Sequence, residues 1–270
     1  TIIINSMQLS FILPNKKEVV VREILFKDLR KFSLYEDFTI TDTIEFLETF
    51  IVTQGLNIVE KFLAFLFLRE VCISDQLTVG SKKGNVNVNF EHIRSNIGSF
   101  EDISEQVTID GIEFTLNYPY QYNLGDSDFI LSCIEKIKIQ DEIVYPPTLN
   151  KNDTKLIMDK IPKGILEYLQ NFLIKNSNYF NINILEERKT IGVQEININI
   201  LTTTFPTFIV RLFNYVSDTD YRQLIFLLCK RIPDVNFLIN STYKELNDFY
   251  DLYKDEIEKH NQNLKNQKSS

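Results

Sequence analysis

The chain has 270 residues, of which 44% are hydrophobic and 12% aromatic, and a formal net charge of −8 at pH 7. This hydrophobic content is typical of a globular protein with a buried core, and excludes a disordered chain. The acidic balance, with a pI near 5.0, argues against nucleic-acid binding, which needs basic clusters to neutralise phosphates. The apolar run Phe62–Leu68 is far shorter than the roughly 20 residues of a membrane span, so no membrane partner is expected.

The beginning of the chain predicts a hairpin followed by two helices. Met7–Leu13 and Val19–Arg22 alternate apolar and polar residues on either side of a turn, which is typical of paired strands. Lys27–Glu36 is predicted as a short helix. We expect Asp42 to cap the next helix, because Glu45 follows three residues later and the two would form a capping box.

The segment Leu56–Val71 is strongly apolar and predicts a helix inside the core. Glu60, Lys61 and Arg69 leave only a thin polar stripe on it, and a helix that is apolar on most faces is surrounded by protein. The pattern then changes to alternation across Leu77–Phe90, which predicts a second hairpin. The rest of the chain is expected to cover these two elements.

The middle of the chain predicts a third hairpin and then a helix. Val107–Asn117 alternates around Asp110-Gly111, a dipeptide that favours tight hairpin turns. From Asp126 the chain is expected to be mostly helical, because one helix face would collect Phe129, Ile130, Cys133, Ile134 and Ile137. The prolines of Tyr145–Pro147 form the clearest break in the chain.

The remaining residues predict helices with one strand between them. The expected helices are Pro162–Lys175, Pro206–Val216, Asp220–Arg231 and Thr242–Glu258. Val193–Ile200 alternates and is predicted as a strand or hairpin, while Thr242 and Glu245 form a capping box for the last helix.

Together these elements predict an α+β fold that is mostly helical, with two to three small antiparallel β-hairpins. Residues 1–146 form the expected N-terminal α+β half, with the buried helix and the polar hairpins. Residues 147–258 form the expected mainly helical half, and residues 259–270 a flexible tail.

The residues that usually carry chemistry are few and scattered. Cys72, Cys133 and Cys229 lie far apart among apolar residues, so we expect buried, reduced thiols, which fit a reducing cytoplasm. His260 falls at the end of the last predicted helix, and His92 has only its neighbour Glu91 as a nearby acidic group. Since metal and catalytic sites need several convergent groups, no bound transition metal, no cofactor and no catalytic residue are expected.

Two further patterns have simple structural explanations. Gly80–Gly84 contains glycines and lysines, but it lacks the Gly-Lys-Ser/Thr ending of a phosphate loop and no helix follows it. We therefore interpret it as a solvated turn. The paired carboxylates Asp126 and Asp128, and Asp218 and Asp220, precede apolar segments, where Asp is expected at the N-terminus of a helix.

Four tyrosines are candidate protein-contact residues. Tyr118 and Tyr120 form a small aromatic platform with Tyr122, and without a basic surround they favour packing or protein contact over nucleotide stacking. Tyr250 and Tyr253 lie on the apolar stripe of the last helix, which also contains Leu246, Phe249 and Ile257. We expect the stripe first of all to pack on the protein's own second half. Because tyrosine is common at protein interfaces, Tyr250 and Tyr253 at its edge are the candidates for contact with a neighbouring tail subunit.

The order of several short pieces resembles one family of phage proteins. The pieces are a strand with a Leu-Pro turn, a strand ending in Arg-Glu, a buried helix ending in Leu-Arg, a polar hairpin, a strand ending in Tyr-Pro, a Cys-Ile-x-x-Ile helix and an Ile-Pro helix start. They are Phe11–Val19, Val21–Ile24, Phe67–Arg69, Leu77–Phe90, Phe114–Pro119, Cys133–Ile137 and Ile161–Pro162. This order, spread over residues 7–258, resembles the T4-like bacteriophage baseplate hub and hub-assembly proteins.

The resemblance implies a structural or assembly role without catalysis. The chain would bind other phage baseplate or tail proteins, with itself as a possible further partner in a homo-oligomer, in the virion tail baseplate or in the host cytoplasm during assembly. Relatives carry Cys-x-x-Cys pairs in the two polar hairpins. Here Leu77–Phe90 and Leu185–Ile200 contain no cysteine, so the resemblance implies no metal site at either hairpin.

Two other classes of protein stay open at the level of sequence. A soluble enzyme would need a cluster of polar groups in a pocket, for which the sequence offers few candidates. A cytoplasmic interaction or chaperone module unrelated to phages would share the composition, and genomic context would separate it, because a phage tail protein has tail genes as neighbours.

Overall fold

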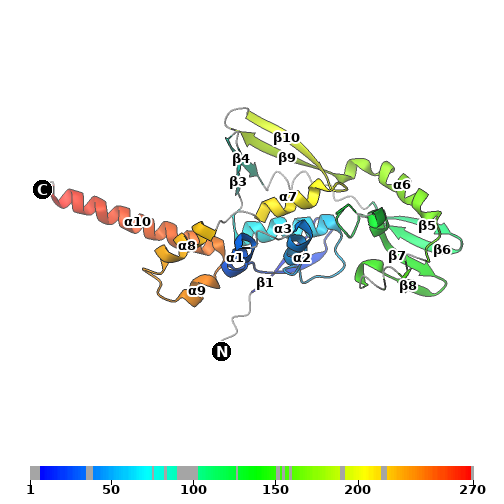
Figure 1. Ribbon diagram of the computed structural model, residues 1–270, viewed down its shortest axis with the longest axis horizontal. Helices are drawn as coiled ribbons and strands as arrows, with labels where there is room; N and C mark the ends of the chain where they lie inside the picture. The colour runs from blue at the N-terminus through cyan, green and yellow to red at the C-terminus, as the bar shows by residue number, and fades with distance from the viewer. Residues whose placement is uncertain are drawn as a thin grey trace.

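The computed structural model describes residues 7–34, 39–74, 76–81, 84–89, 103–125, 127–149, 153, 156–157, 160–188, 192–213 and 218–268. Figure 1 shows an elongated molecule with two helices crossing its middle, a small sheet at one end and a projecting C-terminal helix at the other. The described elements confirm an α+β fold with small antiparallel sheets of two to four strands.

The first block of the fold is the expected hairpin with the helices that follow it. Its elements are β1 (Gln8–Ile12), β2 (Glu18–Arg22), α1 (Phe26–Leu34), α2 (Ile40–Glu48) and α3 (Ile58–Cys72). The N-cap of α2 is Thr39 and not Asp42. The Thr39 hydroxyl accepts a hydrogen bond from the Asp42 amide at 3.1 Å, and the Asp42 carboxylate accepts one from the Thr39 amide at 3.0 Å. The capping box therefore begins three residues earlier than expected.

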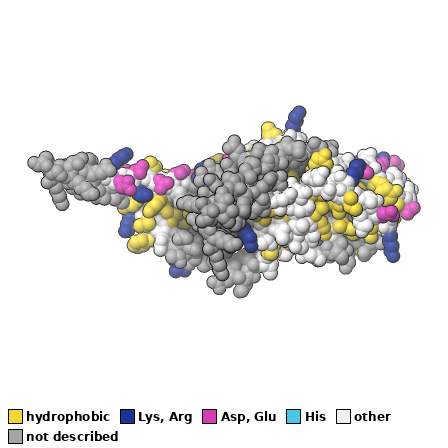
Figure 2. Space-filling view, turned by 90° about the horizontal axis from the view of Figure 1, so that it is seen from above, with side chains coloured by type: hydrophobic (Ala, Val, Ile, Leu, Met, Phe, Trp, Pro, Cys, Tyr) yellow, Lys and Arg dark blue, Asp and Glu magenta, His cyan; other side chains and the backbone are white. Residues whose placement is uncertain are grey.

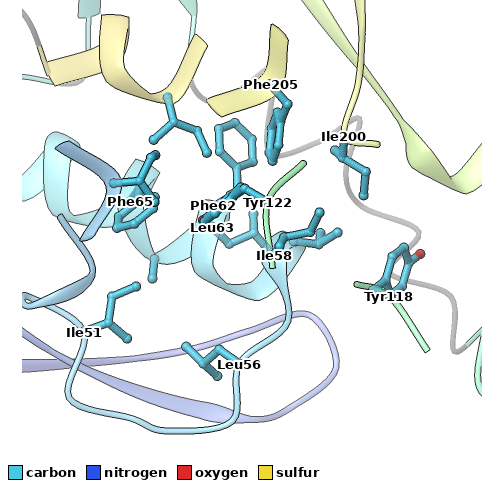
Figure 3. Packing of buried hydrophobic residues seen from close by; sticks show 14 of the residues in the cluster. Ile51, Leu56, Ile58, Phe62, Leu63, Phe65, Tyr118, Tyr122, Ile200 and Phe205 are labelled. Atoms are coloured by element: carbon cyan, nitrogen blue, oxygen red, sulfur yellow. The ribbon is translucent and has the colours of Figure 1, made fainter. Parts of the chain in front are cut away.

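Helix α3 is the centre of the core, as its sequence predicts. Asn57 caps it by accepting from the amides of Val59 and Glu60, at 3.0 and 2.9 Å. Figure 3 shows Phe62 and Phe65 of α3 beneath the overlying helix α7 (Thr204–Phe213), with Phe205 beside them. The Phe62 and Phe205 ring centroids are 5.2 Å apart. One hydrophobic cluster extends from Leu13 to Phe213 around this pair of helices.

Two four-stranded antiparallel sheets flank this core. The first has the order β5-β6-β7-β8, with β5 (Glu105–Ile109), β6 (Ile112–Leu116), β7 (Ile134–Ile139) and β8 (Glu142–Val144). The expected Asp110-Gly111 turn joins β5 to β6, and both of its residues have positive φ, 50° and 79°. This is the backbone that a two-residue hairpin turn needs.

The prediction of a helix across Phe129–Ile137 is wrong. Residues Ser127–Cys133 form a 3₁₀ helix, and Ile134–Ile139 is strand β7, paired with β6 and β8. Ile134 and Ile137 are both buried although their spacing is odd, because the register between β6 and β7 shifts at Thr115 and Leu116. A β-bulge of this kind moves side chains between faces and so imitates helical spacing.

The second sheet joins the two halves of the chain. Its order is β10-β9-β4-β3, with β3 (Gln76–Ser81), β4 (Gly84–Asn89), β9 (Asn181–Arg188) and β10 (Gly192–Asn199). Both alternating segments are therefore hairpins, and β4 pairs with β9 from Val86↔Arg188 to Val88↔Glu186. The break at Tyr145–Pro147 lies in a short 3₁₀ turn (Pro146–Thr148) between parts that share one cluster and one sheet.

The remaining helices are α6 (Ile165–Lys175), α8 (Asp218–Leu228), α9 (Val235–Ile239) and α10 (Tyr243–Lys268), with a 3₁₀ turn at Ser177–Phe180. Helices α8, α9 and α10 gather around a second, smaller cluster that contains Phe26 of α1, Leu228, Leu238 and Leu246. Helix α10 continues ten residues past the expected end at Glu258, because residues 259–268 contain neither proline nor glycine to stop it.

Candidate protein-interaction surface

The start of α10 is fixed by its capping box and by the N-terminal block. The Thr242 amide donates to the Glu245 carboxylate at 2.7 Å, and the Glu245 amide donates to the Thr242 hydroxyl at 3.2 Å, as the sequence predicts. Thr242 also forms an antiparallel bridge with Leu25, and the Phe26 amide donates to the Ser241 carbonyl at 2.8 Å. The direction in which α10 leaves the body is therefore set at its first turn.

The apolar stripe of α10 packs against the protein's own helices over its first half. Leu246 is completely buried, and the ring centroids of Phe249 and Phe237 of α9 are 6.0 Å apart. Tyr250 is half-buried at the border of the smaller cluster. The stripe thus serves the protein's own fold at its core side and leaves part of Tyr250 at the surface.

Arg231 contacts α10 at Tyr253 and Glu256. Its guanidinium lies 5.5 Å from the Tyr253 ring centroid, and its Nη2 donates to the Glu256 carboxylate at 2.6 Å. Arg231 and Glu256 are more than half exposed, so the ion pair itself adds little stability. It leaves Tyr253 half-buried, with a polar rim on one side of the ring.

Large apolar side chains are exposed on the same helices. Phe226 of α8 is 66% exposed and Leu252 of α10 is 64% exposed, and Val235 and Phe237 of α9 are also at the surface. Figure 2 shows hydrophobic side chains at the base of the projecting helix, among acidic and basic ones. Apolar groups gathered in this way, with a charged rim, are typical of protein-binding surfaces.

The other two candidate tyrosines lie in the interior of the protein. Tyr118 is 4% exposed and meets Phe180 edge to face, with ring centroids 5.8 Å apart. Tyr120 is 9% exposed. Burial raises the pKa of Tyr120 far above its usual value, and the nearby Glu135 carboxylate, which accepts a hydrogen bond from the hydroxyl, raises it further. Both rings support the fold, and only a small part of either is open to a partner.

A hollow of about 210 Å³ lies beside Tyr120 and was not expected from the sequence. Glu48, Lys61, Gly55 and Pro147 are among its lining residues. The Lys61 amine donates to the Glu48 carboxylate at 2.7 Å and to the Tyr120 carbonyl at 3.2 Å. The charge of Lys61 is therefore already balanced within the chain.

Two of the three cysteines are buried, as the sequence predicts. Cys72 and Cys133 are buried, and burial raises the pKa of each thiol to about 12. Cys229 is only half-buried. Within the described part of the chain, no three His, Cys, Asp or Glu side chains come together as metal ligands would. The expectation that the protein binds no transition metal stays a prediction.

Several other candidates fall outside the described residues or carry no described side chain. His92, Asp126 and the two lysines at the tip of the β3–β4 hairpin lie outside the described residues. Gly80 and Gly84 belong to strands β3 and β4, in agreement with a hairpin turn. Asp218 and Asp220 occupy the first turn of α8, where an acidic residue is expected.

Comparison with known proteins now gives the chain its relatives. A family model described as T4 bacteriophage base plate protein matches residues 6–206, which include every described element from β1 to the start of α7. The chain belongs to this family. No curated protein and no solved structure matches it.

Membership of the T4 base plate family confirms the resemblance at the level of the phage baseplate. It gives the chain a structural role in the phage baseplate, a place in the virion tail, and contact with other tail or baseplate proteins. It decides against an interaction module unrelated to phages. The match ends at residue 206, so α8, α9, α10 and the stripe lie beyond it. Among the described helices, none is long and apolar enough to cross a membrane.

Proposed function

We propose that the chain is a non-enzymatic component of the baseplate hub that binds neighbouring hub proteins through helix α10. The observation that carries the proposal is the half-buried edge formed by Tyr250 and Tyr253 on α10. The protein acts as a connector, in the mature virion or in the host cytoplasm while the hub is assembled.

The position of this edge supports the proposal. The family match covers the scaffold from β1 to the start of α7, and the Leu25–Thr242 bridge and the Phe26–Ser241 hydrogen bond attach the start of α10 to α1 of this scaffold. Tyrosine rings that are half covered by their own chain are already held in place, so a partner gains contact area at a low cost in entropy. The polar rim at Arg231 and Glu256 gives a partner hydrogen-bonding groups that set its orientation.

The test is a double substitution, Tyr250→Ala with Tyr253→Ala, in the phage genome. Because both rings are only half-buried, we expect the melting temperature of the purified chain to fall by no more than about 4 °C. Baseplates purified from the mutant phage should contain clearly less of the chain than wild-type baseplates, as measured by mass spectrometry. A phage that needs the chain during assembly alone would show the loss in assembly intermediates.

A matched control replaces two exposed tyrosines far from α10. Tyr145 and Tyr168 are 47% and 48% exposed, and their change to Ala removes two rings from another part of the surface. The control should incorporate normally. Equal loss of incorporation in both double variants would show that the loss is not specific to α10, and would contradict the proposal. A large fall in melting temperature with normal incorporation of the α10 variant would show that α10 serves only the protein's own core.

A further inference from the structure

Strand β1 has an open edge. It pairs with β2 along its whole length, and no described strand pairs with its other side. Met7, just before the strand, is 61% exposed, and Ile12, at its end, is 73% exposed. Proteins usually protect such an edge with a charge, a proline or a bulge. Residues 7–12 contain neither a charged residue nor a proline, and their pairing with β2 is regular.

The hydrogen bonds of β2 show which groups of β1 point to the open edge. The Val20 carbonyl accepts a hydrogen bond from the Val52 amide at 2.9 Å, so Val20 bonds on the side of β2 away from β1. Hydrogen-bonded and non-hydrogen-bonded pairs alternate along an antiparallel ladder. Ser10 is the partner of Val20, so its N–H and C=O point to the open edge, and so do those of Gln8 and Ile12, two residues to either side.

This edge is complementary to itself. When two β1 strands run antiparallel around a two-fold axis at Ser10, Ser10 meets Ser10, and Gln8 meets Ile12 of the other copy. Every residue with outward backbone groups then meets another such residue, so all of these groups are hydrogen-bonded across the axis. The same register sets Leu9 opposite Phe11, an aromatic–aliphatic pair of the kind that stabilises sheets. Since the strand is uncharged, no like charges meet.

The core face of β1 is only partly covered by the chain itself. Leu9 and Phe11 are half-buried, and the Phe11 ring stacks on that of Phe67 of α3, also half-buried, with centroids 4.3 Å apart. These three side chains lie at the border of the larger hydrophobic cluster. In the register around Ser10, Leu9 and Phe11 of the second copy lie beside those of the first. They would remove further apolar surface of this border from water, which favours the pairing.

We propose that β1 pairs with β1 of a second copy of this chain, antiparallel and with the two-fold axis at Ser10. The two hairpins then form one continuous sheet, β2-β1-β1-β2. Sheets of three or more strands are more stable than an isolated hairpin. Because the same strand serves both copies, the contact closes at two copies. The pairing requires no other protein and uses none of the residues of the proposed hub contact on α10.

The first experiment places charges at the two-fold axis. Sedimentation equilibrium of the full-length wild type should show a dimer. Ser10 is exposed, so its substitution should not disturb the fold of one chain. In Ser10→Lys and in Ser10→Asp, like charges meet at the axis, and the dissociation constant of each dimer should rise about fivefold. An equal mixture of the two variants should dimerise more tightly than either alone, because Lys then meets Asp.

The matched control is Gln170→Lys, which adds the same charge at an exposed position of α6 and should leave the dissociation constant unchanged. A wild type that is monomeric at its highest soluble concentration would overturn the proposal and leave the edge of β1 to a strand of another protein. Equal weakening by Gln170→Lys and Ser10→Lys, or a mixture no tighter than the separate variants, would also overturn it.

The second experiment tests the register by cross-linking, in a Cys229→Ser background that removes the half-buried thiol. Ser10→Cys should form a covalent dimer on mild oxidation, because Cα atoms of a hydrogen-bonded antiparallel pair lie about 5.5 Å apart, within disulfide range. Gln8→Cys should not, since its two copies are separated by about 14 Å along the strands. Equal cross-linking of the two variants, or none, would overturn the register.

These outcomes are independent of the proposed hub contact. A chain that dimerises through β1 but is missing from baseplates contradicts the proposed function alone. A monomeric chain that is found in baseplates contradicts the pairing alone.

Discussion

Glu60 and Arg69 of helix α3 show how buried polar residues tie this fold together. The Glu60 carboxylate accepts hydrogen bonds from the Asn57 amide, the Lys17 amine and the Asn15 amide group, each at 3.0 Å. Asn15 and Lys17 belong to the β1–β2 turn, so one carboxylate holds this hairpin on the N-terminus of α3. A buried charge is stable in this way only when several donors surround it.

Arg69 provides the matching connection at the other end of α3. It is fully buried, its Nε donates to the Leu212 carbonyl of α7 at 2.6 Å, and its Nη1 donates to the Ser74 carbonyl. We predict that Arg69→Met lowers the free energy of unfolding by about 1–3 kcal/mol, because the buried Leu212 carbonyl and the partly buried Ser74 carbonyl lose their donor. Urea denaturation measures the loss. Lys244→Met, at an exposed position of α10, is the control and should change stability by less than about 0.5 kcal/mol.

The three thiols should differ in reactivity. A thiol reacts as its thiolate, and pKa values near 12 leave Cys72 and Cys133 protonated at pH 8, within the protein interior. We predict that a thiol reagent modifies the native chain only at Cys229, and that urea exposes the other two. Labelling of the native Cys229→Ser variant would contradict this.

At the scale of elements, helix α3 carries the largest share of the core. Phe65 and Leu66 are both buried, and the Phe65 and Phe213 ring centroids are 6.0 Å apart, edge to face. We predict that Phe65→Ala or Leu66→Ala each costs about 2–5 kcal/mol, since truncation leaves a cavity beneath α7. Chemical denaturation would contradict this with a loss below about 1 kcal/mol for both variants.

The sequence predicts elements well where local chemistry decides and poorly where pairing decides. Asp110-Gly111 and the Thr242–Glu245 box act over a few residues, and both are found as expected. Strand β7 was missed because its bulge against β6 gives buried residues a helical spacing. The β4–β9 pairing joins segments about a hundred residues apart, and the sequence of neither hairpin indicates that it pairs with the other.

The candidate surface shows the same division. The stripe of α10 follows from its spacing, and so does the position of Tyr250 and Tyr253 on it. The burial of Tyr118 and Tyr120 does not, because it depends on Phe180 and on the 3₁₀ helix that supplies the Ser132 carbonyl to the Tyr120 amide, at 3.0 Å. Phe180 is distant in the chain and the 3₁₀ helix was not expected, so the sequence does not distinguish this buried aromatic platform from an exposed one.

At the scale of the whole molecule, the described residues form two hydrophobic clusters of unequal size. The larger surrounds α3 and α7, while the smaller joins α8, α9 and α10 to Phe26 of α1. We predict that amide hydrogen exchange is slowest in α3 and faster in α8 and α9, because a small cluster opens at a lower free energy than the global one. Mass spectrometry of peptides from the native chain measures both rates. Equal protection of the two regions would show one cooperative unit.

The sheet that joins the two halves also determines the order in which parts of the protein can fold during translation. The β3–β4 hairpin leaves the ribosome about a hundred residues before β9, its neighbour from Val86↔Arg188 onward. At ordinary synthesis rates, this delay is on the order of 5–20 s. Throughout it, the edge of β4 has no partner and α3 has no α7 above it. The core around α3 and the β10-β9-β4-β3 sheet therefore cannot be completed until most of the chain has been translated. Any protection from aggregation that the nascent chain needs falls within that interval.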